Sequence, residues 1–423
     1  MKMKQNHITL LLLCAGALLT ATSCKKDLFD EEIYNTAVAY NFMIDNADPD
    51  HDWCLTHYSA TTIRKSDNIV NRVQLLDANP YVTADAQIVA ESMVFGSGER
   101  LAYTVPVTNT SLFLVGYDVY GNDLGYISVP FATPSLSVSA EDFLKPGAIK
   151  TPTYQKFTYI YESDFPIPGD FDYNDMVLRI SKKHPELGNM FVVDLTVTLE
   201  ACGADEVYGA AIQLVGINYD DITKVEIVDG QAMDTGYPLS RTFTSGDVLT
   251  RGRQGEAVIN LFESAQWALG RTTDELGDIA VIHYNVSRNT SEKSKVVAPV
   301  TTTYRIRFKD SDVAHSMTFD RIDPFIIHES SSGGIWEVHT FAHKFDATLQ
   351  NINTEAYRKN NVSWSLIIPM ADFRYTRYGM PLGSYNSDNG EVFGAYDGFT
   401  GWMRNRLTNR DWYRTVTLPQ LVY

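Results

Sequence analysis

The sequence has few cysteines, few basic residues and only one long apolar run. Four cysteines occur in 423 residues, with neither a CxxC pair nor the Cys/His spacing of a zinc site. Lys and Arg number 35 against 52 Asp and Glu, which gives a formal net charge of −17. Such a surface repels nucleic acids and anionic headgroups, so we expect neither as a partner.

The apolar run lies at the N-terminus and is typical of an export signal. Lys2 and Lys4 make the start positive, an apolar stretch from Ile8 to Leu19 follows, and small residues lead into Cys24. The stretch is shorter than the about 20 residues that a spanning helix needs. Small residues before a cysteine resemble a bacterial lipobox. This resemblance implies that residues 1–23 are a lipoprotein signal peptide and that Cys24 is lipidated; an ordinary cysteine near a normal cleavage site is the alternative.

Lipidation at Cys24 would anchor the chain to a membrane. Burial of acyl chains contributes about 0.8 kcal/mol per CH₂, so two chains hold a protein stably. Residues 24–35 are polar and acidic and are predicted to be a tether. Of the remaining cysteines, Cys54 and Cys202 could pair in an oxidising compartment, or both could be free buried thiols.

Short segments of alternating polarity, separated by Gly, Asp and Asn turns, predict an all-β fold of mainly antiparallel β-sandwich domains. Residues 36–135 are predicted to be a small β-sandwich. Prolines 130, 134, 146 and 152 predict a Pro-rich linker at 136–156. Residues 157–423 are predicted to form a second, larger β domain.

Within this second domain, Phe191 to Glu200 is the clearest strand. Its apolar residues at 191, 193, 195, 197 and 199 would share one face, because side chains alternate along a strand. Two short helices are predicted, at Asn260 to Leu269 and at Tyr396 to Leu407. The apolar stripe of the second helix is more typical of a core than of a ligand platform.

Three carboxylates and an amide are crowded into six residues of the second domain: Asp170, Asp172, Asn174 and Asp175. An extended backbone would point Asp170, Asp172 and Asn174 to one side. Oxygen ligands at tight spacing suit Ca²⁺, which takes 6–8 oxygens, and Glu162 could supply a further carboxylate. The segment is not an EF-hand, because Asp175 and Ser181 stand where that loop needs Gly and Glu. The alternative is that these side chains only cap turns.

The residues from Glu162 through Asp170–Asp175 resemble the signature of the LruC-domain family of bacterial lipoproteins. Ser163 stands where the family has Asp. Similarity continues at 323–327, 336–339, 364–369, 395–402 and 411–413, and covers about 157–423. The resemblance implies an extracytoplasmic, outer-membrane lipoprotein, periplasmic or surface-exposed, and a related Asn-Asp signature in other secreted β domains is associated with calcium binding. The family has no established biochemical activity that the resemblance could carry over to this chain.

No catalytic motif is recognisable in the sequence. Glu337, His339 and His343 suggest a metal site, yet no HExxH is present and residues 335–339 alternate like a strand. We therefore expect a non-enzymatic, calcium-stabilised surface-binding or scaffolding protein with a protein or glycan ligand. The alternatives are a fimbrial or adhesin subunit and, least favoured, a glycan-active enzyme whose aromatic residues Trp402, Trp412 and Tyr413 stack on sugars.

Overall fold

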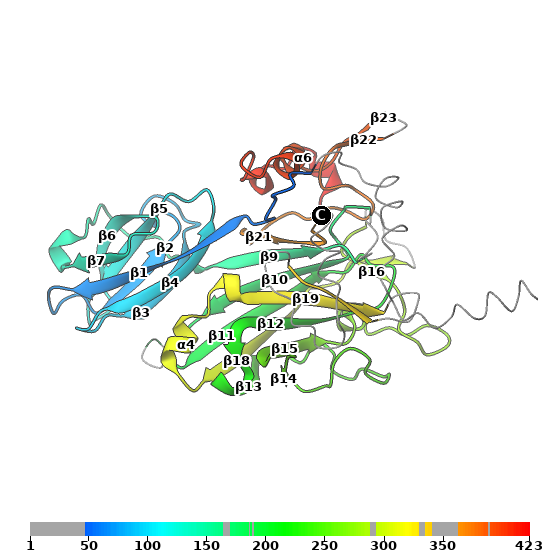
Figure 1. Cartoon of the computed structure of the whole chain (residues 1–423), viewed down its shortest axis with the longest axis horizontal. Helices are drawn as coiled ribbons and strands as arrows, with labels where there is room; N and C mark the ends of the chain where they lie inside the picture. Colours follow the sequence, from blue (N-terminus) through cyan, green and yellow to red (C-terminus); the bar gives the residue numbers. More distant parts are fainter. Residues whose placement is uncertain are drawn as a thin grey trace, which may run out of the picture.

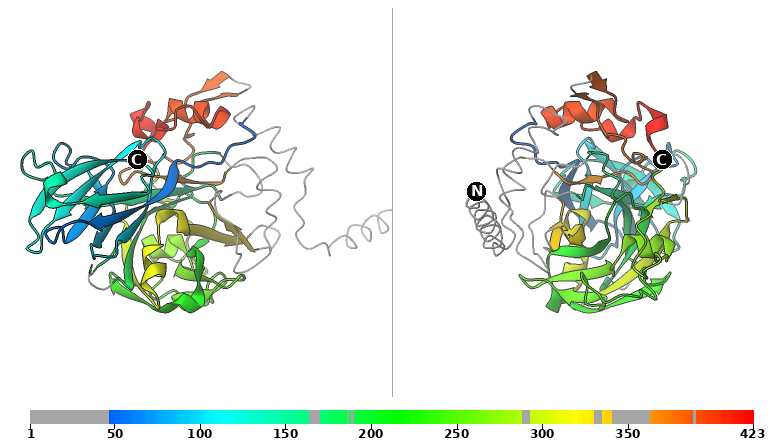
Figure 2. Two further views of the ribbon diagram at one scale, coloured as in Figure 1. Left: turned by 60° about the vertical axis from the view of Figure 1, so that its left-hand side comes forward. Right: turned by 90° about the vertical axis from the view of Figure 1, so that its right-hand side faces the viewer.

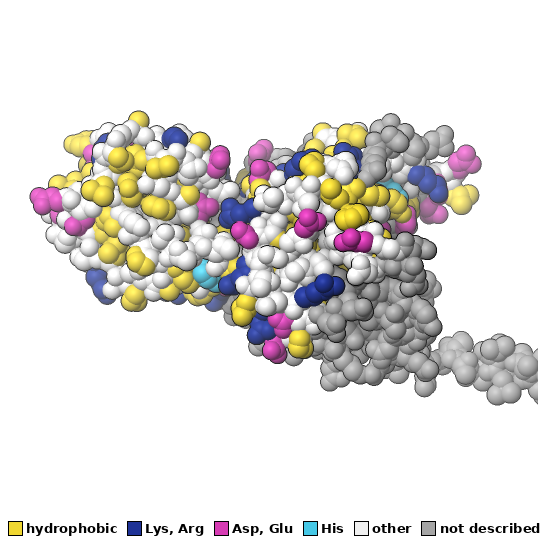
Figure 3. All heavy atoms as spheres, turned by 90° about the horizontal axis from the view of Figure 1, so that it is seen from above, with side chains coloured by type: hydrophobic (Ala, Val, Ile, Leu, Met, Phe, Trp, Pro, Cys, Tyr) yellow, Lys and Arg dark blue, Asp and Glu magenta, His cyan; other side chains and the backbone are white. Residues whose placement is uncertain are grey.

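The computed structural model describes residues 47–163, 170–185, 187, 190–287, 293–329, 335–340, 363–387 and 390–423. They form two β units that lie side by side (Figure 1) and are visible as two lobes joined at a waist in Figure 3. Residues 1–46, which include the predicted signal peptide, Cys24 and the tether, lie outside the described residues. Within the described part of the chain, no helix has the length and apolar character required to cross a membrane.

The smaller unit is a sandwich of two sheets, with strand orders β4-β1-β7 and β6-β5-β2-β3-β8. Its strands are β1 (Thr56–Lys65), β2 (Arg72–Leu76), β3 (Gln87–Met93), β4 (Glu99–Pro106), β5 (Ser111–Tyr117), β6 (Asp123–Pro130), β7 (Ser135–Val138) and β8 (Thr153–Tyr154). Buried Ile63, Leu75, Tyr103 and Leu114 come from both sheets and share one core. The two sheets of the smaller unit therefore enclose a common core, with strands that run from Thr56 to Tyr154.

The segment predicted as a linker, 136–156, instead contributes two strands to the smaller unit. β7 pairs in parallel with β1, and β8 pairs in parallel with β3. Between them lie the 3-10 helix η1 (Ala140–Asp142) and the proline-containing loop. Proline is compatible with edge strands because they have one unpaired side, and β7 and β8 are both edge strands.

The larger unit packs a six-stranded sheet, β13-β18-β11-β10-β9-β21, on a five-stranded sheet, β14-β15-β12-β19-β20. Figure 2 shows these sheets with α6 and the residues after it above them. The strands are β9 (Lys156–Tyr161), β10 (Met176–Lys183), β11 (Val192–Ala201), β12 (Tyr208–Asn218), β13 (Ile222–Asp229), β14 (Leu249–Arg251), β15 (Glu256–Phe262), β18 (Val300–Phe308), β19 (Ile322–Glu329), β20 (Ile335–Val338) and β21 (Ser365–Ile368). Two small ladders join β16 (His283–Tyr284) to β17 (Ser294–Lys295) and β22 (Tyr385–Ser387) to β23 (Gly390–Val392). The predicted all-β fold is confirmed.

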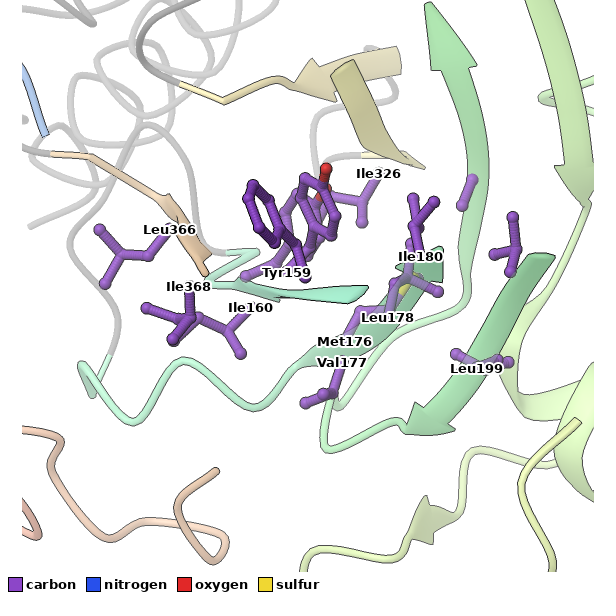
Figure 4. Packing of buried hydrophobic residues seen from close by; sticks show 14 of the residues in the cluster. Tyr159, Ile160, Met176, Val177, Leu178, Ile180, Leu199, Ile326, Leu366 and Ile368 are labelled. Atoms are coloured by element: carbon purple, nitrogen blue, oxygen red, sulfur yellow. The ribbon is translucent and has the colours of Figure 1, made fainter. Parts of the chain in front are cut away.

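The core of the larger unit follows the predicted alternation. Val193, Leu195, Val197 and Leu199 of β11 are fully buried, and Figure 4 shows neighbouring side chains of β9, β10 and β21 gathered in the same core. Phe191 precedes the strand and is 46% exposed, contrary to its predicted place on the inner face.

The short helices agree with the prediction only in part. Residues 260–262 continue β15, and α3 (Ala265–Gly270) begins after Ser264, whose hydroxyl caps it by accepting from the Trp267 N–H at 3.1 Å. The predicted helix therefore began too early, because an apolar run alone does not distinguish a strand from a helix. α6 (Asp397–Arg404) lies within the predicted range and buries its apolar stripe. The other helical turns among the described residues are η2 (Tyr219–Asp221), α4 (Ser311–His315), η3 (Phe319–Arg321), η4 (Trp412–Arg414) and η5 (Pro419–Leu421).

Residues 48–55 pack on the larger unit, although the prediction assigned them to the smaller one. Trp53 and Leu55 belong to the core of the larger unit. The ring of His51 stacks on Trp53 at 4.4 Å, and its Nε2 lies 3.0 Å from the carbonyl oxygen of Trp402. Arg406 forms an ion pair with Asp48 at 2.9 Å. These contacts fix the start of the described chain against α6.

Cys54 and Cys202 are both free thiols.

Candidate metal centre

The acidic cluster lies in the loop that joins two neighbouring strands of the larger sheet. β9 ends at Tyr161, β10 begins at Met176, and these two residues are paired across the ladder. Glu162 prolongs β9, since its N–H donates to the Trp364 carbonyl oxygen at 2.8 Å. Residues 164–169 of this loop lie outside the described residues. The paired strands therefore hold both ends of the loop in place.

The sequence pattern suggested an extended loop backbone. The structure instead has a left-handed backbone at two aromatic residues of the loop. Phe171 has φ 55° and Tyr173 has φ 52°, a conformation that is unfavourable for bulky residues. Tertiary contacts stabilise it: the Tyr173 hydroxyl donates to the Ser363 carbonyl oxygen at 2.7 Å, and its ring lies 6.1 Å from that of Phe399. Both aromatic side chains are buried. Packing of the aromatic residues thus sets the shape of the loop.

Three of the predicted ligands meet in this loop. One carboxylate oxygen each from Glu162, Asp170 and Asp172 lies within 4.8 Å of the others. Glu162 and Asp172 are 1% and 2% exposed, whereas Asp170 is exposed. Burial raises the pKa of the Glu162 and Asp172 carboxyl groups well above the usual range, and the neighbouring carboxylates raise these pKa values further. The ionised cluster is unfavourable without a compensating positive charge.

Backbone N–H groups satisfy only part of this cluster. Tyr173 donates to Glu162 Oε1 at 2.6 Å, and Asp172 accepts from Asn174 and Gly379 at 3.1 and 2.7 Å. Glu162 Oε2 and both polar side-chain atoms of Asn174 are buried without a hydrogen-bond partner among the described residues. Neither Glu162 nor Asp172 takes part in an ion pair within this described part of the chain. Buried oxygens without partners are costly unless a cation or a bound water satisfies them.

Asn174 is held by a residue that sequence analysis did not identify. A Cβ atom at Gly203 would lie 2.0 Å from Asn174 Oδ1, and the Gly203 N–H donates to the Asn174 carbonyl oxygen at 3.0 Å. Position 203 therefore has to be glycine, because any side chain would collide with the Asn174 side chain in its observed position. Gly203 and Gly379 are distant in the sequence from the loop, so no local pattern could have identified them.

Asp175 takes a different role from the three clustered carboxylates. Its Oδ2 accepts from the backbone N–H and the hydroxyl of Ser163, at 2.7 and 2.6 Å. Ser163 therefore holds Asp175 through two donated hydrogen bonds. The assignment of Asp175 as a metal ligand stays a prediction.

A second group of buried acids lies on β19 and β20. Asp323 Oδ2 is 2.7 Å from His339 Nδ1, and Glu337 Oε2 is 3.2 Å from His339 Nε2. Burial alone would lower the pKa of His339, but the two carboxylates raise it to about 9. All three side chains are at most 1% exposed, so they are closed off from solvent. His343 lies outside the described residues.

The aromatic residues considered for sugar stacking lie in the core. Trp402, Trp412 and Tyr413 are 1%, 4% and 2% exposed. Trp412 packs against Trp402 at a centroid distance of 5.9 Å and against Tyr413 at 6.0 Å. These three residues stabilise the layer around α6, and none presents an open face for a ligand.

Comparison with known proteins identifies a family and a distant structural likeness. Residues 188–413, slightly more than half of the chain, match the family model described as "Domain of unknown function (DUF4842)". A crystal structure of a protein from Bacteroides ovatus, described as a "putative lipoprotein", aligns with a TM-score of 0.47 at 13% identity, over 84% of this chain and 99% of that one. A search among curated proteins found no match. The resemblance to the LruC family stays a prediction.

Proposed function

This chain belongs to the DUF4842 family, and we propose that it is a non-enzymatic, lipid-anchored protein of the outer membrane whose 162–175 loop binds calcium. The bound ion would hold the loop against the sheet and against residues 363–379. The rigid larger unit would then serve as a binding or scaffolding module. The family match begins at residue 188, after the loop, and includes Gly203 and Gly379.

One observation carries the calcium assignment: three converging carboxylates adjoin buried oxygens that have no partner among the described residues. The donors are carboxylate and amide oxygens only, which is the set that Ca²⁺ prefers. Asp172 and Glu162 lie on the buried side of the cluster and Asp170 on the exposed side, so solvent can deliver the ion. Asn174 Oδ1 is a further neutral oxygen at the same loop.

The calcium assignment predicts that Ca²⁺ stabilises the chain from Lys25 onward. Ligand at 100 times its dissociation constant stabilises by about 2.7 kcal/mol, so the melting temperature in calcium should exceed that in chelator. Asp172→Asn removes one ligand charge and should abolish this gain. Thermal melting with and without calcium measures both effects.

Glu91→Gln is the matched control for this experiment. Glu91 is also a buried acid, but it lies in the smaller unit and accepts from Gln74 and Tyr154 at 2.9 and 2.8 Å. This variant should keep the full calcium response. Equal melting of the unsubstituted chain in calcium and in chelator would refute calcium binding.

The lipid anchor is supported by the sequence before the described residues. Cys24 follows an apolar stretch and small residues, as in a lipobox. Expression of the full chain in a bacterium with labelled fatty acid should label the protein and place it in the detergent phase, and Cys24→Ala should abolish both. Label retained by Cys24→Ala would contradict anchoring at this residue.

The non-enzymatic assignment is supported by the burial of the group that His339 forms with two carboxylates. His339, Asp323 and Glu337 are enclosed between β19, β20 and the core. The ring of His339 is also stacked on Phe325 at 4.3 Å. A general acid or base must lie within hydrogen-bond reach of its substrate, and the enclosure of these three side chains argues against that role.

A further inference from the structure

An open groove lies between the β22–β23 hairpin and α6. These two elements are at the top of Figure 1. Its volume is about 380 Å³, within the range of about 300–1,000 Å³ typical of small-molecule sites. The hairpin contributes Tyr385, Asn386 and Glu391, Phe393 follows it, and α6 contributes Asp397 and Arg404. None of these residues belongs to the calcium loop.

The base of the groove is rigid because two backbone segments touch there. A Cβ atom on Gly394 would lie 2.2 Å from the carbonyl carbon of Gly383, so only glycine fits at position 394. The Thr400 hydroxyl donates to the Ser384 carbonyl oxygen at 2.6 Å, and the Gly394 N–H donates to the Ser384 hydroxyl at 3.0 Å. These contacts fix the hairpin on α6, so the groove is largely preformed.

The side chains that face the groove carry polar groups that are not used in contacts with the described residues. Asn386, Glu391, Asp397 and Arg404 form no side-chain hydrogen bond or ion pair with any residue that the structure describes. Beside them, the ring of Phe393 is 59% exposed. Several donors and acceptors beside one exposed aromatic ring in the same concave groove form a combination that can bind a small ligand.

The chemistry of these groups defines a ligand class. Two carboxylates accept hydrogen bonds, a guanidinium donates them, and an amide does both. An aromatic ring offers an apolar face. A sugar matches this combination, because its hydroxyl groups both donate and accept and one face of its ring carries C–H groups. Glu391 and Asp397 outnumber Arg404, which disfavours an anionic ligand.

We propose that the groove between β22–β23 and α6 binds a neutral oligosaccharide, with Phe393 stacking on one sugar ring and Asp397, Glu391 and Arg404 binding its hydroxyl groups. This site differs from the buried tryptophans on α6 and η4. It shares no residue with the calcium site, so either assignment can fail while the other holds.

The test applies the chain from Lys25 onward, in calcium, to an array of neutral oligosaccharides of glucose, mannose, galactose and xylose in α and β linkages. Sulfated and sialylated oligosaccharides serve as anionic probes. We expect retention of at least one neutral oligosaccharide with no stronger binding of anionic ones. Calorimetry with the best neutral oligosaccharide then measures affinity.

Phe393→Ala and Asp397→Asn should each reduce this affinity at least tenfold. Phe95→Ala is the matched control, since Phe95 is 56% exposed in the smaller unit, and it should bind as the unsubstituted chain does. All three side chains are exposed, so melting temperatures should stay unchanged. The proposal is overturned if no neutral oligosaccharide is retained, if only anionic ones are, or if both groove variants bind normally.

Discussion

The larger unit buries acidic groups in two places and neutralises them differently. On β19 and β20, the chain itself supplies the positive charge, because His339 lies between Asp323 and Glu337. In the loop after β9, Glu162 and Asp172 are buried beside Asp170, and no basic side chain of the described residues pairs with the two buried acids. The first group is therefore a structural ion network, and we propose that the second is completed by an ion from solution.

Among the variants that test this comparison, removal of His339 should cause the largest loss of folding stability. His339→Ala leaves Asp323 and Glu337 buried without their cation, and loss of one partner of a buried ion pair typically costs about 3–5 kcal/mol. Denaturant unfolding should show this loss, while calcium still raises the remaining stability. A loss below about 1 kcal/mol would show that His339 does not carry the neutralising charge. If the variant does not fold, Glu337→Gln provides a milder test.

The protonated imidazole of His339 should also make folding stability depend on pH, with a smaller change than its removal causes. Burial lowers the pKa of His339, but Asp323 and Glu337 outweigh burial and raise this pKa from an ordinary 6.5 to about 9 in the folded chain. Since the folded state holds the proton more tightly, its contribution is complete below pH 6.5 and is lost as pH rises to about 9. Melting in saturating calcium should therefore fall over this range.

Glu337→Gln is the control for the pH experiment. One of the two carboxylates that raise the pKa of His339 is then neutral, so the upper end of the transition should move to lower pH. A flat melting temperature between pH 6.5 and 9, or an identical profile in this variant, would contradict the assignment of a charged His339.

Gly203→Ala should lower both the folding stability and the calcium affinity of the 162–175 loop. The added methyl group meets Asn174 Oδ1, and overpacking of this kind costs about 1–3 kcal/mol. Displacement of Asn174 should also weaken calcium binding, which calorimetry measures. Gly216→Ala is a control for glycine replacement without a close neighbour, although its φ of 70° adds backbone strain; it should leave calcium affinity unchanged. Unaltered calcium affinity in Gly203→Ala would separate Asn174 from the site.

Glu162→Gln should change folding stability least of these variants, and the sign of the change should depend on whether calcium is present. In chelator, the amide replaces a carboxyl group whose ionisation burial and the neighbouring acids disfavour, so stability should equal or slightly exceed that of the unsubstituted chain. In calcium, the same variant should be the less stable of the two, because a ligand is lost. Melting curves in both conditions test this reversal. Destabilisation of similar size in both would indicate a purely structural glutamate.

Part of the site was visible in the sequence because its residues are close along the chain. Asp170, Asp172 and Asn174 lie within five positions, and Glu162 precedes them by eight. The roles of Gly203 and Gly379 were not visible, because contact between distant segments defines them. The left-handed backbone at Phe171 and Tyr173 was not predicted either, since packing against Ser363 and Phe399 overrides local preference.

The errors of the fold prediction have the same origin. The proline-rich segment 136–156 was expected to be a linker, but β7 and β8 are edge strands, which tolerate nearby prolines. Residues 260–262 were assigned to a helix because a short apolar run fits a strand or a helix equally well. Only the neighbouring strands β12 and β14 distinguish the two.

The amino-acid order alone determined the β class, the crowding of acidic groups after β9 and the apolar segment before Cys24, because each depends on residues a few positions apart. Tertiary structure decided which buried acids have a cation, which glycines leave room for them and which aromatic rings stay exposed at the groove. Charge compensation and close packing depend on distances between segments far apart in the chain, and these distances exist only once the sheets have formed.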